Sequence, residues 1–366
     1  MNKYYTDLNP EVKEYFKILS PVFPEWLFPY IDTPEMQRIG KISISCGTDY
    51  SKLFNIRYPY SNLDHSVGVA LIIWHFTHDK KQTLAGLFHD IATPVFKHCI
   101  DFMNGDSEHQ ESTEERTTEI IKNSKSIMSL LENDGIKLEE VCDYKIYPIA
   151  DNETPKLSAD RFEYTFSSGL TFFRIWELDK IRHVYNNIII GKNEQGIDEL
   201  TFRDKHVCEE YINTISRIWP EWISNEDKIV MQFLADIEKS MNIAGFLSID
   251  DLYRMSEQEV IDLILSCSDS YLSQSFQKFQ NATKVYSSPI EIADRYCVNI
   301  KSKTRYIVPL VQTQNGTVRI SQMSQQANKQ IMEFLNQPPT TWIYFDFDFI
   351  PYGEPKIKRY LKVPEK

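Results

Sequence analysis

The amino-acid sequence predicts a mainly helical fold, with a helical bundle over residues 1–288 and a smaller α+β region over residues 289–366. Apolar residues recur at helical spacing through most of the first part. Alternation of apolar and polar residues with a period of two appears near the C-terminus. Ser287-Ser288-Pro289 interrupts the chain between the two patterns. A length of 366 residues, 42% of them hydrophobic, is enough for one large domain with a smaller one attached.

A pair of helices joined by a short polar turn is expected over residues 64–78 and 83–92. The turn has the sequence His78-Asp79-Lys80-Lys81. In the first helix, apolar residues recur at helical spacing, at Val67, Leu71, Ile72 and Trp74. Helices joined by so short a turn should lie antiparallel, which brings the start of the first beside the end of the second.

Pro94 should end the second helix, because a proline disfavours helical geometry in the residue before it. Thr93 followed by Pro94 is also a typical helix start, with threonine as the cap and proline at the first position. The chain is therefore expected to break at Thr93 and to begin a new helix. That helix would carry His98 and Asp101 on one face.

Later helices follow from the same periodicity. They are expected at residues 112–132, 157–167, 171–184, 225–241 and 256–266. Ser256 and Glu259 form a capping box at the start of the last of these helices.

The C-terminal region should contain strands. Residues 304–311 and 317–320 flank the turn pair Asn315-Gly316, a typical hairpin signal. A further strand is expected over residues 343–349, where the period of two is clear, and Pro338-Pro339 separates it from a preceding helix.

Composition restricts the classes of partner. The net charge is −12 and no dense lysine and arginine run is present, so polymeric DNA or RNA is a poor candidate partner, although a small anionic substrate is not excluded. The longest apolar stretch, residues 67–76, is far too short to span a bilayer. No signal-peptide core is evident and the six cysteines form no CxxC pair, so a cytoplasmic protein with reduced thiols is expected.

Histidine and aspartate residues form a candidate metal site. Neutral imidazoles and ionised carboxylates are the ligands of borderline divalent metals, and the set suits Mn, Fe, Co, Ni, Zn or Mg without selecting one. The helical pair should bring His65 near His89 and Asp90. Asp160 begins a later helix and can join them only through the tertiary fold. One divalent metal ion per chain is therefore predicted.

The remaining polar residues have two interpretations. His98 with Asp101, and His109 in a polar stretch, could be surface residues or could orient a water and protonate a leaving oxygen beside a metal-bound phosphate. Asp346 and Asp348 are expected on the solvent face of a strand. Solvated or packing positions are expected for His75, His78, His183 and His206.

Four segments resemble the HD-domain phosphohydrolases, in particular the branch of dGTPases and related deoxynucleoside triphosphate triphosphohydrolases. They are IDTPEMQRIGKI (31–42), NLDHSVGVA (62–70), LFHDIATPVFKH (87–98) and LSADRFEY (157–164). The segments follow the family's order over a motif core of residues 31–165. The C-terminal region resembles the family's tail only loosely.

The resemblance implies an HD-domain helical bundle with defined roles for several residues. The implied metal ligands are His65, His89, Asp90 and Asp160. The implied catalytic residues are His98 and Asp101, which would orient the attacking water, and His109, which would protonate the leaving oxygen. The implied substrate contacts are Arg38, Arg161 and Tyr164.

Several family positions are replaced in this chain. The family's phosphate-binding arginine is Asn62, and the second histidine of its HDIGH motif is Thr93. The glutamate after the candidate acid is Gln110, the glutamine that reads the sugar is Ile44, and the second arginine of QRLR is Gly40. The metal ligands are thus retained while several substrate contacts differ.

The function expected from the sequence is metal-dependent hydrolysis of a phosphoester. The substrate would be a small phosphorylated compound, with a nucleotide favoured. Two alternatives stay open: a non-catalytic nucleotide-binding regulatory protein, motivated by Asn62, Thr93 and Ile44, and an HD-type di-iron oxygenase, which would need further histidine ligands. Assembly into a homo-oligomer is expected only by analogy with the family.

Overall fold

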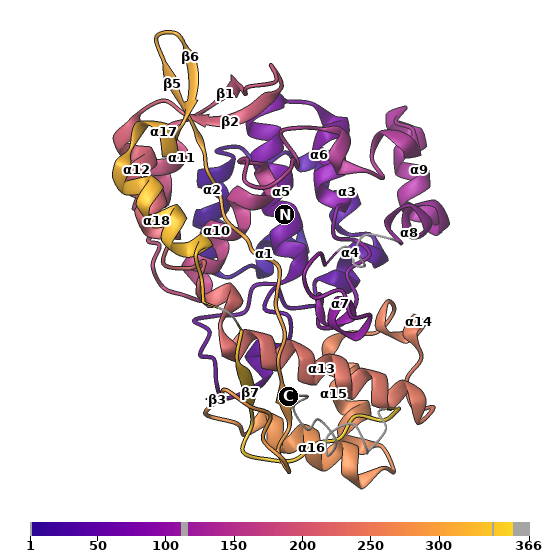
Figure 1. Cartoon of the computed structure of the whole chain (residues 1–366). Helices are drawn as coiled ribbons and strands as arrows, with labels where there is room; N and C mark the ends of the chain where they lie inside the picture. Colours follow the sequence, from indigo (N-terminus) through magenta and orange to yellow (C-terminus); the bar gives the residue numbers. More distant parts are fainter. Residues whose placement is uncertain (1, 111–115, 339, 354–366) are drawn as a thin grey trace.

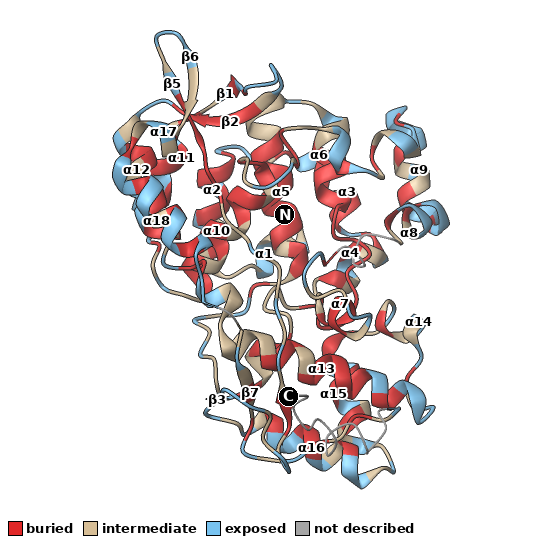
Figure 2. Cartoon of the chain, viewed as in Figure 1, coloured by how far each residue is buried: buried red, intermediate tan, exposed pale blue. Residues whose placement is uncertain are grey.

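Helices make up most of the fold, and the computed structural model describes residues 2–110, 116–338 and 340–353 (Figure 1). Two hydrophobic clusters lie inside it, and Figure 2 shows buried segments in both the upper and the lower part of the molecule. The predicted mainly helical fold with a smaller α+β part is confirmed.

The larger cluster is surrounded by helices and one sheet. The helices are α1 (Lys3–Asp7), α2 (Pro10–Leu19), α3 (Phe28–Ile31), α4 (Pro34–Ile39), α5 (Asn62–Thr77), α6 (Lys80–Phe88), α8 (Thr117–Asn123), α9 (Lys125–Asp134), α10 (Ala159–Thr171), α11 (Leu178–Tyr185), α12 (Lys205–Ile215), α17 (Ile320–Met323) and α18 (Gln325–Leu335). The strands are β1 (Ile188–Lys192), β2 (Asp198–Phe202), β5 (Leu310–Thr313) and β6 (Gly316–Arg319).

The smaller cluster lies in the lower part of Figure 1. Its elements are α7 (Cys99–Met103), α13 (Asn225–Ile243), α14 (Ile249–Leu252), α15 (Glu257–Ser266), α16 (Ser270–Gln280), β3 (Tyr286–Ser288), β4 (Cys297–Val298) and β7 (Trp342–Tyr344). Short 3-10 helices connect the elements: η1 (Glu25–Leu27), η2 (Thr48–Tyr50), η3 (Leu138–Glu140), η4 (Tyr144–Ile146) and η5 (Glu221–Ile223).

The predicted pair of helices is present as α5 and α6, which pack against each other. Ser61 and Asp64 form a capping box that starts α5. Most of α5 is buried, because α2, α6 and α10 all pack against it. The second helix is displaced from the expected range, since it ends at Phe88 and leaves His89 as its C-terminal cap.

The helix expected to start at Thr93 begins only at Cys99, so that prediction is wrong. Tight turns precede it, and Phe96 and Lys97 have left-handed φ angles of 54° and 50°. Tertiary contacts explain the difference. The Val95 N–H donates to the Leu252 carbonyl at 2.9 Å. This hydrogen bond joins Val95 to a distant segment of the chain instead of to a local helix.

Other helix boundaries also differ from the prediction. The segment 112–132 forms two helices, α8 and α9, which meet at Ser124, while residues 112–115 lie outside the described residues. The helix expected over residues 171–184 begins at Leu178. The capping box of Ser256 and Glu259 and the helices over 225–241 and 256–266 are confirmed as α13 and α15. Helices α12 and α16 were not predicted.

The first sheet has the strand order β1-β2-β5-β6. The hairpin around Asn315-Gly316 is confirmed as β5 and β6, although its first strand begins at Leu310 rather than at residue 304. The antiparallel hairpin β1–β2 was not predicted and lies inside the part expected to be helical. Its second strand pairs in parallel with β5, with Thr201 opposite Leu310.

The second sheet has the order β3-β7-β4. The strand expected over residues 343–349 is shorter and spans Trp342–Tyr344, and α18 is the helix expected before Pro338-Pro339. Both sheets pair strands from the two sides of residue 288. The division into domains at residue 288 therefore does not follow the sheets, and it stays a prediction.

Two buried glutamates lie in the smaller cluster. Both carboxylate oxygens of Glu238 lack a hydrogen-bond partner, while Glu257 Oε2 accepts a hydrogen bond from the Tyr50 hydroxyl at 2.8 Å. Burial raises the pKa of Glu257 to about 8 and holds the pKa of Glu238 well above its usual range. Both groups are therefore expected to be protonated in the folded protein at neutral pH.

The free energy of unfolding should fall as the pH rises from about 5 to 9. The pKa of Glu257 is higher in the folded than in the unfolded protein, so stability is complete below the unfolded pKa and is lost as the pH rises through the folded pKa. The loss should be of the order of a few kcal/mol. Urea denaturation across this range measures it. Glu257→Gln should flatten the slope, and Glu333→Gln, at an exposed ion pair with Lys329, should not. Equal slopes for wild type and Glu257→Gln would contradict the prediction.

Candidate metal centre and substrate cavity

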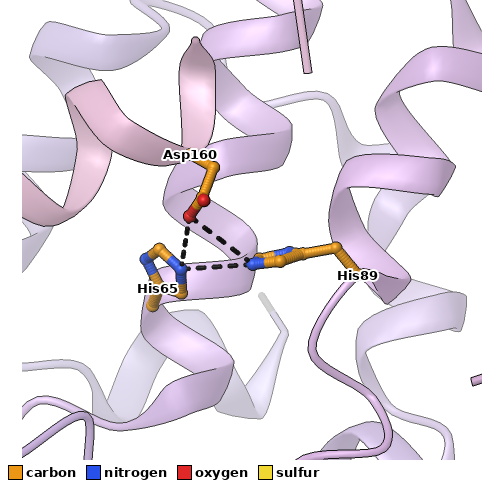
Figure 3. A group of neighbouring side chains, drawn as sticks. All are labelled: His65, His89 and Asp160. Atoms are coloured by element: carbon orange, nitrogen blue, oxygen red, sulfur yellow. Dashed lines mark hydrogen bonds and ion pairs between the residues drawn. The ribbon is translucent and has the colours of Figure 1, made fainter. Parts of the chain in front are cut away.

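Three predicted metal ligands converge from three helices (Figure 3). His65 lies on α5, His89 caps α6, and Asp160 is in the first turn of α10. The two Nε2 atoms are 3.2 Å apart. Asp160 Oδ1 lies 3.1 Å from His65 Nε2 and 3.7 Å from His89 Nε2. Each residue thus directs one ligand atom to a common point.

These separations fit a shared metal ion. Ligand atoms that bind one ion at about 2.0–2.2 Å are about 3–3.5 Å from one another. The fourth predicted ligand, Asp90, follows His89 directly, and its Oδ2 lies 3.5 Å from His89 Nε2 and 3.9 Å from His65 Nε2. The four predicted ligands are therefore brought together, with Asp90 at the side of the three-residue cluster.

A buried glutamate orients His65. Glu163 lies one helical turn after Asp160 on α10 and hydrogen-bonds His65 Nδ1. The same carboxylate accepts hydrogen bonds from the hydroxyls of Tyr60 at 2.7 Å, Tyr15 at 3.2 Å and Ser167 at 3.1 Å. A carboxylate on Nδ1 fixes the proton there and leaves Nε2 unprotonated for a metal.

Hydrogen bonds at Nδ1 leave Nε2 as the nitrogen that faces the cluster in both histidines. His89 Nδ1 donates to the Gly86 carbonyl at 2.8 Å, so its Nε2 also faces the cluster as an acceptor. Burial alone would lower the pKa of His65, but Glu163 and Asp160 outweigh burial and raise it to about 9. A metal ion would have to displace this proton.

Glu163 was missed at the sequence level, although its spacing from Asp160 was a usable signal, since residues three apart share a helix face. The packing of α10 on α5 depends on Gly68. A Cβ atom at Gly68 would lie 2.8 Å from the Glu163 side chain, closer than side chains normally approach. The glycine therefore lets the carboxylate reach His65.

Lys97 is a buried residue of the site that was also missed. Its ammonium donates to Asp90 Oδ2 at 2.8 Å and to Asn62 Oδ1 at 2.9 Å. Asn62 Nδ2 in turn donates to the Thr93 hydroxyl at 2.9 Å. Two positions that differ from the family pattern, Asn62 and Thr93, therefore contact each other, and Lys97 brings a positive charge beside them. Burial lowers the pKa of Lys97, but Asp90 together with Cys46 and Asp160 raises it above its usual value, so the amine stays charged.

A cavity of about 680 Å³ is lined by the predicted metal ligands. Cationic side chains in its wall include Lys97, Arg161, Lys303 and Arg305. Aromatic side chains include Phe54, Tyr144, Tyr164, Phe172, Phe173 and Trp222. Charged groups and flat rings together suit a ligand with both an anionic and an aromatic part.

His98 lines the cavity and Asp101 supports it. His98 Nδ1 is 3.0 Å from Asp101 Oδ2, so Nδ1 donates and Nε2 is left as an acceptor. Arg305 Nη2 donates to that Nε2 at 3.3 Å. Burial lowers the pKa of His98 to about 4, and Arg305 acts in the same direction. His98 is therefore neutral near physiological pH.

Two of the predicted site residues lie away from the cavity wall. The His109 side chain is 78% exposed, pairs with Asp106 at 2.8 Å and does not line the cavity. Its assignment as the acid stays a prediction. Arg38 was expected to contact the substrate, but its Nη2 donates to the carbonyls of Ile91 at 3.1 Å and Thr93 at 2.7 Å. Arg38 therefore stabilises the turn after the predicted metal ligands and does not line the cavity.

The other predicted substrate contacts do line the cavity. Arg161 is held by an ion pair with Asp151 at 3.1 Å and by hydrogen bonds to the neighbouring loop. The Tyr164 ring packs edge-on against Trp222, with 5.2 Å between the ring centroids. Ile44, another position that differs from the family pattern, also faces this cavity.

Two residues that were expected at the surface, His206 and Asp346, are found at the surface. His206 pairs with Glu209 and has an 82% exposed side chain, and Asp346 pairs with Arg295 on the surface. All six cysteines are free thiols. In the described ranges, no helix has both the length and the apolar content needed to cross a membrane.

Comparisons with known proteins place this geometry in context, although no family model matches the chain. The uncharacterised protein YdhJ of Bacillus subtilis is 22% identical over 289 residues, which are 76% of this chain and 82% of YdhJ. A Cordyceps militaris protein named metal-dependent phosphohydrolase is 23% identical over 158 residues, 43% of this chain and 43% of its own length.

Solved structures share the fold. A hypothetical protein from Aquifex aeolicus superposes with a TM-score of 0.59 at 14% identity, over 87% of this chain and 91% of its own. A phosphohydrolase from Bacteroides thetaiotaomicron superposes with a TM-score of 0.61 at 12% identity, over 87% of this chain and 94% of its own. The chain therefore has the fold of a solved phosphohydrolase structure.

Proposed function

We propose that this chain is a metal-dependent phosphohydrolase that cleaves a phosphoester of a nucleotide or a related small phosphorylated compound. The observation that carries the proposal is the convergence of His65, His89 and Asp160 in a cavity that also contains cations and aromatic rings. The names of the Cordyceps relative and of the Bacteroides structure support the same class of activity. The narrower likeness to deoxynucleoside triphosphate triphosphohydrolases stays a prediction.

The metal would be held by His65, His89 and Asp160, with Asp90 beside them. Such an ion, when bound, polarises a phosphoryl oxygen and lowers the pKa of a water toward neutrality. The donor set suits several divalent metals.

The chain's own groups supply the remaining chemistry. His98 is neutral and has an acceptor at Nε2, so it can take a proton from an attacking water once the Arg305 hydrogen bond is released. Asp101 keeps the other ring nitrogen protonated and fixes the ring. Lys97 places a charged amine next to Asp90, where it can offset negative charge on a phosphoryl oxygen.

A nucleotide-binding regulatory protein is the second candidate, favoured by the contact between Lys97 and Asp90. The amine already occupies Asp90 Oδ2 at 2.8 Å, which satisfies part of the charge that a metal would otherwise neutralise. The di-iron alternative has less support. Among the described residues, neither His98 nor His109 belongs to the cluster of potential metal ligands.

The deciding experiment is a product screen. The purified protein is loaded in turn with Mn²⁺, Mg²⁺, Co²⁺, Ni²⁺, Zn²⁺ or Fe²⁺ and incubated with nucleoside mono-, di- and triphosphates and with non-nucleotide phosphoesters. We expect metal-dependent product with at least one of them. Binding in a thermal-shift assay without any product would favour the regulatory candidate. Two irons per chain with oxygen uptake would overturn the hydrolase proposal.

A further inference from the structure

Arg305 lies in an extended segment between β4 and β5. We call residues 299–309 the crossing segment, because they run from the lower part of the molecule to the upper sheet (Figure 1). Backbone hydrogen bonds hold it at two points, from Lys303 N to the Ser107 carbonyl at 3.1 Å and from Val308 N to the Pro155 carbonyl at 2.7 Å. The segment is thereby fixed along the cavity, with Arg305 in its wall.

Arg305 differs from two neighbouring cations of the cavity in the kind of partner that its charged group contacts. Lys97 is paired with Asp90, and Arg161 is paired with Asp151. The contacts of the Arg305 guanidinium are with neutral acceptors, His98 Nε2 and Gln110 Oε1. No carboxylate of the described chain forms an ion pair with it.

Asp227 is the acidic cavity residue whose influence on Arg305 has to be considered. It lines the same cavity, and burial raises its pKa to about 7, although Arg305 opposes that rise. Near neutral pH a substantial fraction of the Asp227 carboxyl is therefore uncharged. The charged fraction offsets the charge of Arg305 only in part, and among the described residues no ion pair joins Asp227 to the guanidinium.

We propose that Arg305 binds a phosphate group of the substrate inside the cavity, next to the metal centre. This inference rests on the proposed phosphohydrolase function and assigns its phosphate contact to the crossing segment. A guanidinium offers paired N–H donors that match two oxygens of one phosphate, which makes it the preferred cation for such a group. The arginine expected before Asp64-His65 is Asn62 here, and Arg305 supplies the missing kind of group from a distant part of the chain.

Gln110 keeps Arg305 available for an anion. Its Nε2 donates to the Ser107 carbonyl at 3.0 Å, which turns Oε1 toward the guanidinium. Because the amide is neutral, it orients Arg305 without cancelling its charge. A carboxylate at this buried position would form an ion pair and compete directly with a phosphate.

Phosphate binding would also change the state of His98. The same Arg305 Nη2 atom contacts both Gln110 and His98. A phosphate oxygen that accepts from this group would take the hydrogen bond away from His98 Nε2. The histidine acceptor would then be free for the water that attacks the phosphate.

Binding of pyrophosphate to variants tests the proposal. Isothermal titration calorimetry would compare wild type, Arg305→Ala, Arg305→Lys, Gln110→Glu and the control Lys301→Ala, each as purified and after chelation of metal. Lys301 is an exposed cation of the same crossing segment and does not line the cavity. We expect Arg305→Ala and Gln110→Glu to weaken binding about 10- to 100-fold, and Arg305→Lys to weaken it less. Lys301→Ala should bind as wild type does.

Kinetics with a substrate from the product screen provide the second measurement. KM should be that of wild type in Lys301→Ala and should rise with the loss of pyrophosphate binding, more in Arg305→Ala than in Arg305→Lys. Wild-type affinity in Arg305→Ala and Gln110→Glu, with only a lower Tm, would show that Arg305 merely fastens the crossing segment and would overturn the inference. Arg305-dependent pyrophosphate binding without hydrolysis of any phosphoester would uphold the anion site while refuting the proposed function.

Discussion

Replacement of Asp160 by asparagine should reduce phosphoester hydrolysis at least about a thousandfold, equivalent to about 4 kcal/mol of lost transition-state stabilisation. Asp160 Oδ1 is the anionic ligand atom of the three-residue cluster, and it lies 3.1 Å from His65 Nε2. An amide oxygen is a weaker metal ligand than a carboxylate. The His89→Ala variant should lose activity to a similar extent, since it removes one imidazole from the same point.

The measurement pairs turnover with metal content. Metal analysis by mass spectrometry should show less than one ion per chain in Asp160→Asn, in parallel with the lost activity. Asp346→Asn is the matched control, because it makes the same change at an exposed surface ion pair. Wild-type turnover in Asp160→Asn or His89→Ala would refute the assignment of the metal centre.

Replacement of Glu163 by alanine should both destabilise the protein and weaken metal binding. The variant leaves His65 Nδ1 and the hydroxyls of Tyr15, Tyr60 and Ser167 without their common acceptor. Breaking a buried charged network of this kind costs about 3–5 kcal/mol. Loss of the partner of a metal-binding histidine typically lowers metal affinity about 10- to 100-fold.

Urea denaturation and metal titration measure the two effects separately. Glu163→Gln preserves the volume and one acceptor oxygen, so its losses should be smaller than those of Glu163→Ala. Glu210→Ala, at an exposed pair with His183, serves as the control. If Glu163→Ala bound metal as tightly as wild type, the carboxylate would have no part in orienting His65.

The sequence predicted features that depend on neighbouring residues. The capping box of Ser61 and Asp64 starts α5 as local chemistry requires, and the short turn after His78 brings α5 and α6 together. Candidate metal ligands could be selected because histidine and aspartate chemistry is carried by the residues themselves. Their convergence with Asp160 then followed from helix packing.

Features that depend on distant partners could not be predicted. The helix expected at Thr93 is displaced because the Val95 N–H bonds Leu252 and the Thr93 hydroxyl bonds Asn62. Arg305 has no local signal at all, since its position comes from the crossing segment. The short apolar stretch of β1 does not distinguish a strand from a helix by periodicity, and the neighbouring strand of its hairpin pairs with β5.

His109 lies apart from the other predicted site residues. Its place in the motif order suggested a role, but the side chain points to solvent. Position along a sequence motif therefore picked out residues that the fold brings together, His65, His89 and Asp160, but did not indicate where His109 would lie. Each residue of the candidate metal cluster contacts several others, whereas His109 pairs with the nearby Asp106 in the part of the chain that the structure describes.

The contacts of Asn62, Thr93 and Lys97 restrict how this site could change over time. Each of the three depends on another: Asn62 bonds the Thr93 hydroxyl, and Lys97 bonds Asn62 and Asp90. An arginine introduced alone at position 62 would meet the Lys97 amine in a buried space, and a histidine alone at position 93 would lose the asparagine partner. The three side chains therefore act as one unit, and an exchange at any one of them alters the partners of another.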